Sequence, residues 1–381
     1  MLKKFVSKEP VLKGWSGDKK YCLIDEQGNR FLLRVTPIEK YDEKMKEYKL
    51  MHRVAELGVP MCDPLEFGTC DKGVYSIQTW IDGEDAETIM PNCPAAKQYA
   101  YGMDAGRFLR KIHSIPAPET LEDWEARFNR KIARKTALYE ACPIKYENGQ
   151  AEAFIDYINN NRSLLAGRPQ TFQHGDYHIG NMMIGRDGKL YIIDFNRCDF
   201  GDPWEEFNRI VWCAQKAPVF ASGMVDGYFD GAVPMGFWQL LALYISSNTL
   251  SSLPWAVPFG EKEIATMRNQ ANDVFNWYKG MSDPVPAWYC KSLKRKTDGI
   301  IPPVFTALFI MHNIYQTKDK AKSDSPYERN RFFHWSGRGD LNTRPFGPEP
   351  NALPSCATPR MEPMKRFELL TCALRVRCSA N

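Results

Sequence analysis

The first 80 residues carry short apolar runs separated by polar turns, a pattern that predicts a small β-rich unit. Two of these runs, YCLID and RFLLRV, flank the turn sequence QGN, which is typical of a β-hairpin, and residues 10–13 lead into them as a further strand. Residues 39–57 place apolar side chains at helical spacing, and Gly58 ends this helix. The runs PLEFG and VYSIQTWI then predict a second strand pair around the turn DKG. The predicted order is three strands, one helix and two strands.

Beyond residue 80 the apolar spacing becomes mainly helical. A β-rich segment over residues 172–194 interrupts the helices and contains two strands around the turn RDG. The helices are predicted over residues 95–114, 121–139 and 150–165, and again from 204 to about 279. The chain is therefore predicted to have an α+β fold, with a small antiparallel β lobe over residues 1–80 and a larger helical lobe over residues 81–290.

Residues 291–381 differ from the rest of the chain in pattern and in charge. They show no sustained apolar period and are rich in proline, arginine and asparagine, so we expect a basic tail of low order. This tail holds 16 Lys/Arg and 8 Asp/Glu, which leaves 34 Lys/Arg and 38 Asp/Glu for residues 1–290. Because the excess positive charge lies in the tail, the overall charge of +4 does not indicate a specific nucleic-acid partner.

The N-terminus and the cysteines predict a cytoplasmic protein. The sequence MLKKFVSKEP lacks the apolar run of a signal peptide, and the 11 cysteines form no CxxC pair, as expected for reduced thiols. Two apolar stretches, residues 235–253 and 300–311, are interrupted by polar residues or are short and contain proline. A membrane-spanning helix needs about 20 apolar residues, so no membrane partner is expected.

The stretch HGDYHIGN, residues 174–181, is the densest group of chemically active side chains. Its two histidines could ligate zinc, but a dinuclear hydrolase needs further histidines placed elsewhere. The chain has six histidines: His52, His113, His174, His178, His312 and His334. His52 and His113 lie in amphipathic helices, and His312 and His334 lie in the basic tail, so too few histidines are left to complete a zinc site.

The carboxylates of the same region favour a different chemistry. Asp176 and Asn181 lie five residues apart, and Asp194 follows at the end of the apolar run YIID. Nucleotide-dependent phosphoryl transfer uses such a set, in which one carboxylate orients and deprotonates the acceptor hydroxyl. An amide oxygen and a second carboxylate are suitable ligands for Mg²⁺, a hard cation.

The motifs HGDYHIGN, IIDF and GDPWEEF together resemble the aminoglycoside phosphotransferase and choline kinase family, which has a protein-kinase-like fold. The family pattern H-G-D-x-H-x-x-N, I-D-[FW], G-D-P-x-x-[DE] is met without a gap, and the resemblance covers roughly residues 10–290. It implies that Asp176 is the catalytic base and that Asn181 and Asp194 bind magnesium.

The resemblance also assigns supporting roles around the catalytic loop. His174 and His178 would brace this loop through hydrogen bonds. Asp202 and Glu206, in GDPWEEF, would tie the following segment to the helical lobe.

In the small lobe the resemblance implies contacts to a nucleotide. Ser16 and Gly17 lie in the loop GWSG between two strands, where glycine lets backbone N–H groups approach phosphates. The third strand offers Arg34 where the protein-kinase pattern has lysine, and Glu47 lies on the following helix as the expected partner. Arginine stays charged and can fork onto phosphate or carboxylate, although an ordinary strand-edge cation is the alternative.

The segment between the lobes is expected to bind the purine of ATP or GTP through its backbone, and it includes Gln78 and Trp80. Asp194 is followed by Phe195-Asn196 instead of Phe-Gly, so no activation switch is indicated. The following helices are acid-rich and would suit a cationic acceptor, although solvated helix faces are the alternative for most of the acidic residues taken singly. The acidic residues are Asp199, Asp202, Glu205, Glu206, Asp226 and Asp230.

The resemblance therefore implies a Mg²⁺-dependent phosphotransferase that moves the nucleotide γ-phosphate to a hydroxyl of a small molecule. An aminoglycoside-like compound, a sugar and an amino alcohol remain open as acceptors. The alternative is a catalytically inactive kinase-fold protein that binds nucleotide. This alternative is favoured by Arg34, which stands where the protein-kinase pattern has lysine. The oligomeric state is not indicated by the sequence.

The tail has a resemblance of its own. Its sequences GRGDLNTRPFGPEPNALPSCATPR and RFELLTCALRVRCSAN resemble peptides that arise when transfer-RNA genes are translated on the wrong strand. We therefore hypothesise that residues after about 290 are spurious translation of noncoding sequence fused to a kinase.

Overall fold

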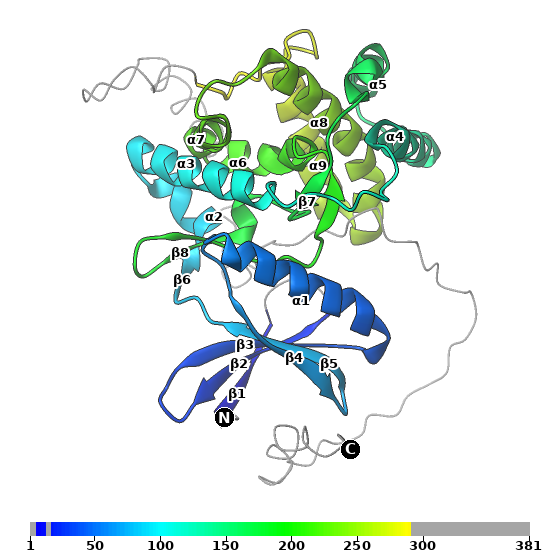
Figure 1. Ribbon diagram of the computed structural model, residues 1–381. Helices are drawn as coiled ribbons and strands as arrows, with labels where there is room; N and C mark the ends of the chain where they lie inside the picture. The colour runs from blue at the N-terminus through cyan, green and yellow to red at the C-terminus, as the bar shows by residue number, and fades with distance from the viewer. Residues whose placement is uncertain (1–4, 13–16, 291–381) are drawn as a thin grey trace, which may run out of the picture. The chain divides into compact units, whose positions relative to one another are not determined.

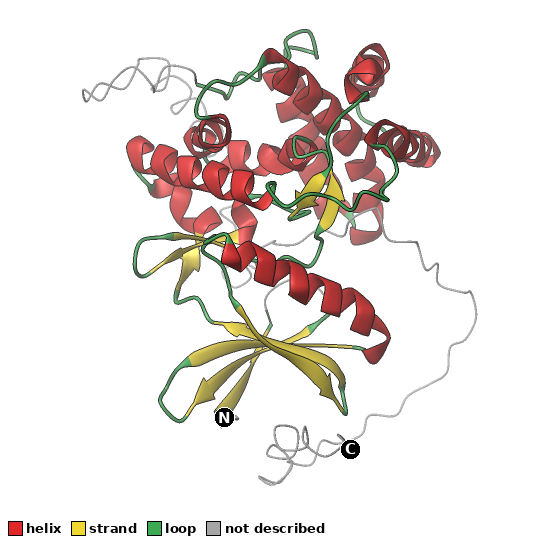
Figure 2. Cartoon of the chain, in the orientation of Figure 1, coloured by secondary structure: helices red, strands yellow, loops and turns green. Residues whose placement is uncertain are grey.

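The computed structural model describes residues 5–12 and 17–290 (Figure 1). Residues 17–289 lie in one compact unit, which holds a β-rich lobe and a helical lobe. Figure 2 shows this division, with the long strands in the first lobe and most helices in the second. The predicted α+β, two-lobed fold is confirmed, while the predicted tail over 291–381 falls outside the described residues.

The small lobe is a five-stranded antiparallel sheet with one helix, α1 (Tyr41–Glu56). Its strand order is β1-β2-β3-β5-β4. Strands β2 and β3, which are consecutive in sequence, pair with each other, and β3 also pairs with β5. The strands are β1 (Phe5–Val11), β2 (Lys19–Asp25), β3 (Arg30–Thr36), β4 (Pro64–Cys70) and β5 (Gly73–Thr79). The predicted order of three strands, a helix and two strands is present.

Alternation of side chains along these strands builds a small apolar core. Leu33 and Val35 on β3 point to the same face because strand side chains alternate. They pack with Leu23, Phe31 and Ile77 in one buried cluster. Arg34, between two of these residues, is therefore directed to the opposite face, where α1 lies (Figure 1).

The helical lobe begins after β5 and contains all the other long helices of the described residues. Its helices are α2 (Ala86–Ile89), α3 (Ala95–Ile112), α4 (Trp124–Ala141), α5 (Gln150–Asn161), α6 (Ile210–Lys216), α7 (Pro218–Phe229), α8 (Met235–Ala256) and α9 (Glu261–Trp277). α8 is buried over most of its length, which explains why its apolar residues form a run rather than one stripe. Among the described residues, no helix combines the length and apolarity needed to cross a membrane.

Two helices of this lobe, α3 and α7, touch backbone to backbone. Gly102 and Gly106 on α3 face Gly223 and Gly227 on α7, and both pairs have the spacing G-x-x-x-G. A Cβ on Gly102 would lie 2.9 Å from the Cα of Gly223. Glycine at all four positions therefore permits the close approach, and we call this contact the glycine seam.

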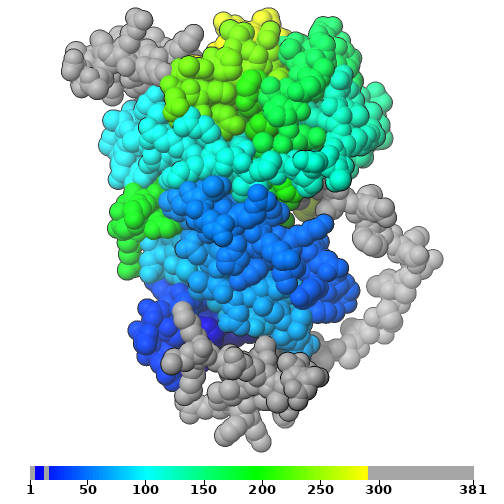
Figure 3. All heavy atoms as spheres, in the orientation of Figure 1, coloured from blue at the N-terminus to red at the C-terminus, as the bar shows by residue number. Residues whose placement is uncertain are grey.

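Short strands between the helices carry the segment HGDYHIGN. β7 (Thr171–Gln173) precedes it and pairs with β10 (Asp199–Gly201), while β8 (Met182–Gly185) follows it. β8 pairs with β9 (Leu190–Ile192) and with β6 (Gly83–Asp85), which directly follows the connection between the lobes. Figure 3 shows the blue small lobe against the cyan and green helical lobe.

The described residues end in a packed segment. The Tyr289 hydroxyl donates a hydrogen bond of 2.8 Å to buried Asp226 on α7, which also accepts one of 2.7 Å from Tyr99 on α3. The ring of Tyr289 lies 4.5 Å from that of Trp238 on α8, measured between centroids. The segment that ends at Tyr289 therefore packs against α7 and α8.

Candidate active site

The catalytic-loop segment, residues 174–181, makes a tight turn that depends on Gly175. Gly175 has a φ of +85°, and a Cβ there would collide with the backbone carbonyl of Arg197. Its amide donates a hydrogen bond of 2.9 Å to the buried carboxylate of Glu206. Glu206, which was expected to tie its segment to the helical lobe, thus also joins that segment to the catalytic loop.

Asp176 lies at the centre of this loop, and its side chain is only 4% exposed. The Asn181 amide donates to its backbone oxygen at 2.9 Å and to its Oδ2 at 3.2 Å. Arg197 donates to Oδ2 at 3.3 Å, and the Nε of Arg209 lies 3.4 Å from Oδ1. His178 Nε2 lies 3.5 Å from the same Oδ1.

The charges around Asp176 keep it ionised. Burial by itself would raise the pKa of this carboxyl. The neighbouring His178, Arg209 and Arg197 together outweigh that effect and hold the pKa of Asp176 well below its usual range. Asp176 is therefore a carboxylate that accepts hydrogen bonds over the whole range of physiological pH.

The two loop histidines are engaged within the protein. His174 is fully buried, accepts the amide of Asp176 at Nδ1 at 3.3 Å, and contacts the carbonyl of Ile193 through Nε2 at 2.9 Å. His178 accepts the amide of Gly180 at Nδ1 at 3.1 Å. Both rings thus support the loop, and the ring nitrogens of His174 are both taken up by backbone groups rather than directed to a metal. Burial also lowers the pKa of His174, which keeps it neutral.

Asp194 follows β9 and is placed beside the loop by a backbone contact. The amide of Ile193 donates to the carbonyl of Asn181 at 3.0 Å, so Asn181 and Asp194 come from adjacent segments. Asp194 has a φ of +71°, an uncommon conformation for a residue with a side chain. Its carboxylate is 29% exposed and accepts a hydrogen bond of 3.2 Å from Arg34 of the small lobe.

Arg34 has a different partner from the one expected. Its Nε donates to Asp18 at 3.1 Å, while Glu47 pairs with Lys44 on the same helix at 2.7 Å. Lys44 lies three residues before Glu47, which places the two side chains on one face of α1. Within the described small lobe, the expected Arg34–Glu47 pair is thus replaced by two others.

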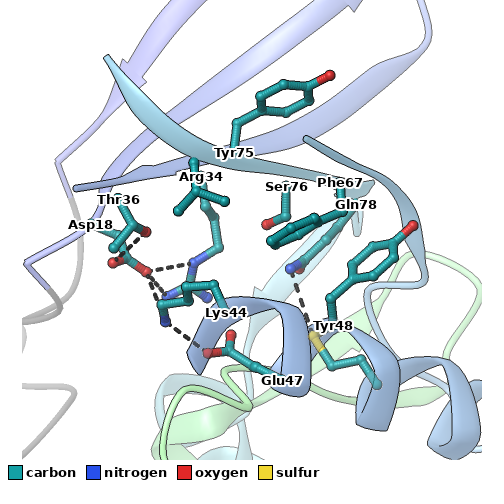
Figure 4. Close-up of a pocket in the computed structure, with 12 residues that line it drawn as sticks. Asp18, Arg34, Thr36, Lys44, Glu47, Tyr48, Phe67, Tyr75, Ser76 and Gln78 are labelled. Carbon is teal, nitrogen blue, oxygen red and sulfur yellow. Dashed lines mark hydrogen bonds and ion pairs between the residues drawn. The ribbon is translucent and has the colours of Figure 1, made fainter. Parts of the chain in front are cut away.

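The remaining predicted nucleotide-binding residues lie around this point. Gly17 is exposed two residues before β2, and Ser16 lies outside the described residues. Gln78 is buried at the end of β5, with its amide nitrogen 3.8 Å from the sulfur of Met51 (Figure 4). Trp80 lies in the connection between the lobes, with the guanidinium of Arg30 5.7 Å from its ring centroid.

Three of the six acidic residues expected to form an acceptor surface are buried in the structure. Asp202 is fully buried and receives two hydrogen bonds from Arg168, at 2.7 and 2.9 Å, and one of 2.5 Å from the hydroxyl of Tyr244. Glu206 and Asp226 are also buried and hydrogen-bonded. Half of the six acidic residues are therefore structural, because each balances polar groups inside the helical lobe.

Sequence reasoning missed Arg197, Arg209, Asp18 and Lys44. Arg197 and Arg209 lie 21 and 33 residues beyond Asp176, and no local pattern marks either of them as a neighbour. Asp18 could have been found from strand register, because it directly precedes β2 and β2 pairs with the strand that carries Arg34.

The sequence matches the phosphotransferase enzyme family over residues 8–238, which is more than half of the chain. The chain therefore belongs to this family, and its two lobes and ordered motifs agree with that membership. Among curated proteins, none matches the sequence.

Solved structures of the same fold include several small-molecule kinases. A thermostable mutant of aminoglycoside phosphotransferase APH(4)-Ia is 14% identical, with a TM-score of 0.53 over 72% of this chain and 95% of that one. The GDP complex of aminoglycoside 2'-phosphotransferase-IIIa is 15% identical, with a TM-score of 0.53 over 71% and 93%. A choline/ethanolamine kinase family protein from Mesorhizobium loti is 14% identical, with a TM-score of 0.53 over 73% and 91%. At these identities the likeness shows the fold.

Proposed function

We propose that this protein transfers the γ-phosphate of ATP or GTP to a hydroxyl of a small molecule in a Mg²⁺-dependent reaction. The observation that carries the proposal is the arrangement of Asp176, Asn181 and Asp194 beside a cation of the opposite lobe, Arg34. Membership of the phosphotransferase enzyme family supports the reaction class.

Asp176 would orient the acceptor hydroxyl. Among the described residues its buried Oδ1 makes no hydrogen bond of standard geometry, although Arg209 Nε and His178 Nε2 lie 3.4 and 3.5 Å away, so it keeps the capacity to accept from one O–H group. Phosphoryl transfer passes through a loose transition state, in which positioning contributes more than early proton removal. A carboxylate with a strongly lowered pKa suits this role, since it stays ionised and takes the proton only as the new bond to phosphorus forms.

Asn181 and Asp194 are the residues that would hold the metal. The amide nitrogen of Asn181 is turned to Asp176, which leaves its oxygen for another partner, and the carboxylate of Asp194 is partly exposed. Both donors are oxygens, as Mg²⁺ prefers. When bound, Mg²⁺ would neutralise charge on the phosphates. Arg34 would add a fixed positive charge on the side of the small lobe.

The donor and acceptor classes come from the fold relatives by analogy. One related structure is an aminoglycoside phosphotransferase with ADP and hygromycin B, and another is amicoumacin kinase hAmiN with AMP-PNP and Ca²⁺. For this chain we propose a nucleotide and a hydroxylated small molecule as partners. The acceptor is expected to be an aminoglycoside-like compound, a sugar or an amino alcohol.

The test measures nucleotide-dependent phosphorylation of a panel drawn from these three classes. Asp176→Asn should abolish transfer while Mg²⁺–nucleotide binding persists, whereas Asp194→Asn should lose transfer and weaken that binding. Asp104→Asn, which changes a carboxylate that is 47% exposed on α3, is the matched control. Full turnover in Asp176→Asn would refute the assignment. Nucleotide binding without transfer to any compound would favour the alternative, an inactive nucleotide-binding protein.

A further inference from the structure

A network of alternating charges surrounds Arg34 in the small lobe (Figure 4). Asp18 lies 3.0 Å from Nη2 of Arg34 and accepts from its Nε at 3.1 Å. Lys44 of α1 lies 3.6 Å from Asp18 and 2.7 Å from Glu47. These four side chains line one pocket between the sheet and α1. The side chains of Arg34 and Asp18 are nearly inaccessible, at 7% and 5% exposed.

Strand register explains why Asp18 reaches Arg34. Lys20 pairs with Arg34 and Lys19 with Val35, so continuing this register places Asp18 opposite Thr36. Thr36 and Arg34 lie two residues apart on β3 and share a face. The Thr36 hydroxyl donates to Oδ1 of Asp18 at 2.9 Å, which leaves Oδ2 for the guanidinium.

Electrostatics favour the pair between Asp18 and Arg34. Burial would raise the pKa of Asp18, but Arg34, Lys44 and the Thr36 hydroxyl outweigh it and lower the pKa. Burial raises the pKa of Glu47 in spite of Lys44 and Arg34. Asp18 is thus the better stabilised anion of the two, and it is the one in direct contact with Arg34.

We propose that Asp18 is the positioning residue of Arg34, in the place that Glu47 was expected to take. Asp18 accepts a hydrogen bond from Nε and lies 3.0 Å from Nη2, while Nη1 donates to Asp194, on the side where the nucleotide phosphates would lie. Asp18 directly follows Gly17 and directly precedes β2, so the same contact joins the start of this strand to Arg34. Fixing the guanidinium before binding lowers the entropy lost when it contacts phosphate. This inference rests on the proposed function.

The test compares Asp18→Asn with Glu47→Gln in the full chain. The probe is binding of the Mg²⁺ complexes of AMP-PNP and its guanine counterpart, measured by calorimetry, together with KM for nucleotide and kcat. We expect Asp18→Asn to weaken binding about tenfold, which is the size expected for a charge-assisted hydrogen bond, and to raise KM more than it lowers kcat. Glu47→Gln should have a smaller effect, because Glu47 acts through Lys44.

A double-mutant cycle separates positioning from loss of structure. In an Arg34→Met background, Asp18→Asn should weaken binding no further, whereas a general structural defect would weaken binding in both backgrounds. Thr36→Val, which removes one hydrogen bond to Asp18 and keeps side-chain volume, should shift KM in the same direction by less. Thr36→Val replaces Asp18→Asn as the test variant if Asp18→Asn fails to fold.

Three results would overturn the inference. They are unchanged binding in Asp18→Asn, an equal loss in the Arg34→Met background, and a larger effect of Glu47→Gln than of Asp18→Asn. If the wild-type chain bound neither nucleotide, the proposed function would fail and this inference with it. Binding that Asp18→Asn leaves intact would refute this inference alone.

Discussion

Gly106→Ala should destabilise the protein, although alanine is the better helix former. Gly106 lies in the glycine seam, where an added Cβ would collide with the carbonyl oxygen of Met224 and would be 2.5 Å from the amide nitrogen of Tyr228. Ordinary contacts begin at 3.4 Å. The two helices would therefore have to separate by about 1 Å, which forfeits a quarter to a half of the dispersion energy of neighbouring contacts.

The magnitude follows from two opposing effects. Overpacking of a tight contact costs about 1–3 kcal/mol, and occasionally more when backbone must move. Replacing glycine by alanine inside a helix gains about 1 kcal/mol. Because the colliding atoms are backbone atoms, we expect the cost to win and the free energy of unfolding to fall by about 2 kcal/mol. Transfer activity should fall too, because the Tyr177 hydroxyl of the catalytic loop donates to Ala105 on α3 at 2.7 Å.

The assay is urea unfolding followed by circular dichroism, with Gly236→Ala as the matched control. Gly236 lies in the first turn of α8, and a Cβ there would meet nothing within 4 Å. The control should therefore be neutral or more stable by up to about 1 kcal/mol. If Gly106→Ala were as stable as Gly236→Ala, the seam would have room for a methyl group and the reasoning would fail.

Two further predictions concern charge. Asp202→Ala should lower the free energy of unfolding by about 3–5 kcal/mol, because it leaves the guanidinium of Arg168 without its buried partner. Urea unfolding checks this against Asp230→Asn, whose ion pair with Arg110 is exposed and whose loss should cost at most about 1 kcal/mol. Arg209→Gln removes a cation from Asp176, so the pKa of that carboxyl should rise and the acid limb of kcat/KM should move to higher pH. Because the wild-type pKa of Asp176 lies well below its usual value of about 4, the pH profile is followed into the acid range, and an acid limb at the same pH in both proteins would contradict this prediction.

The fold was predictable because its elements repeat simple local signals. Apolar spacing and turn sequences predicted α1 as residues 39–57, and the helix spans Tyr41–Glu56. The same signals predicted the strand pair of β4 and β5 around the turn DKG. The pairing of β7 with β10 was not predicted, because three-residue strands carry too little pattern and depend on contacts distant in sequence.

For the candidate site, sequence reasoning reached the loop residues but not their environment. Asp176 and Asn181 share one segment, so their proximity is encoded locally. Two acidic residues lie near Arg34, and the sequence does not show which of them forms the ion pair. Strand register brings Asp18 to Arg34, and Glu47 forms an ion pair with Lys44 instead. The roles predicted for these side chains in binding and catalysis stay predictions until the variants above are measured.

The packing at Tyr289 has a practical consequence for anyone who shortens this chain. Ending it after residue 290 would remove none of the described contacts, because the Tyr289 hydroxyl and its ring already meet Asp226 and Trp238. Ending it before Trp288, which is 4% exposed, would take two aromatic rings out of the packing of α7 and α8. Asp226 on α7, one of the two helices of the glycine seam, would then lose its hydrogen bond from Tyr289, which lies more than 60 residues away in sequence. Ending the chain three residues earlier than residue 290 is thus a change to the packed core.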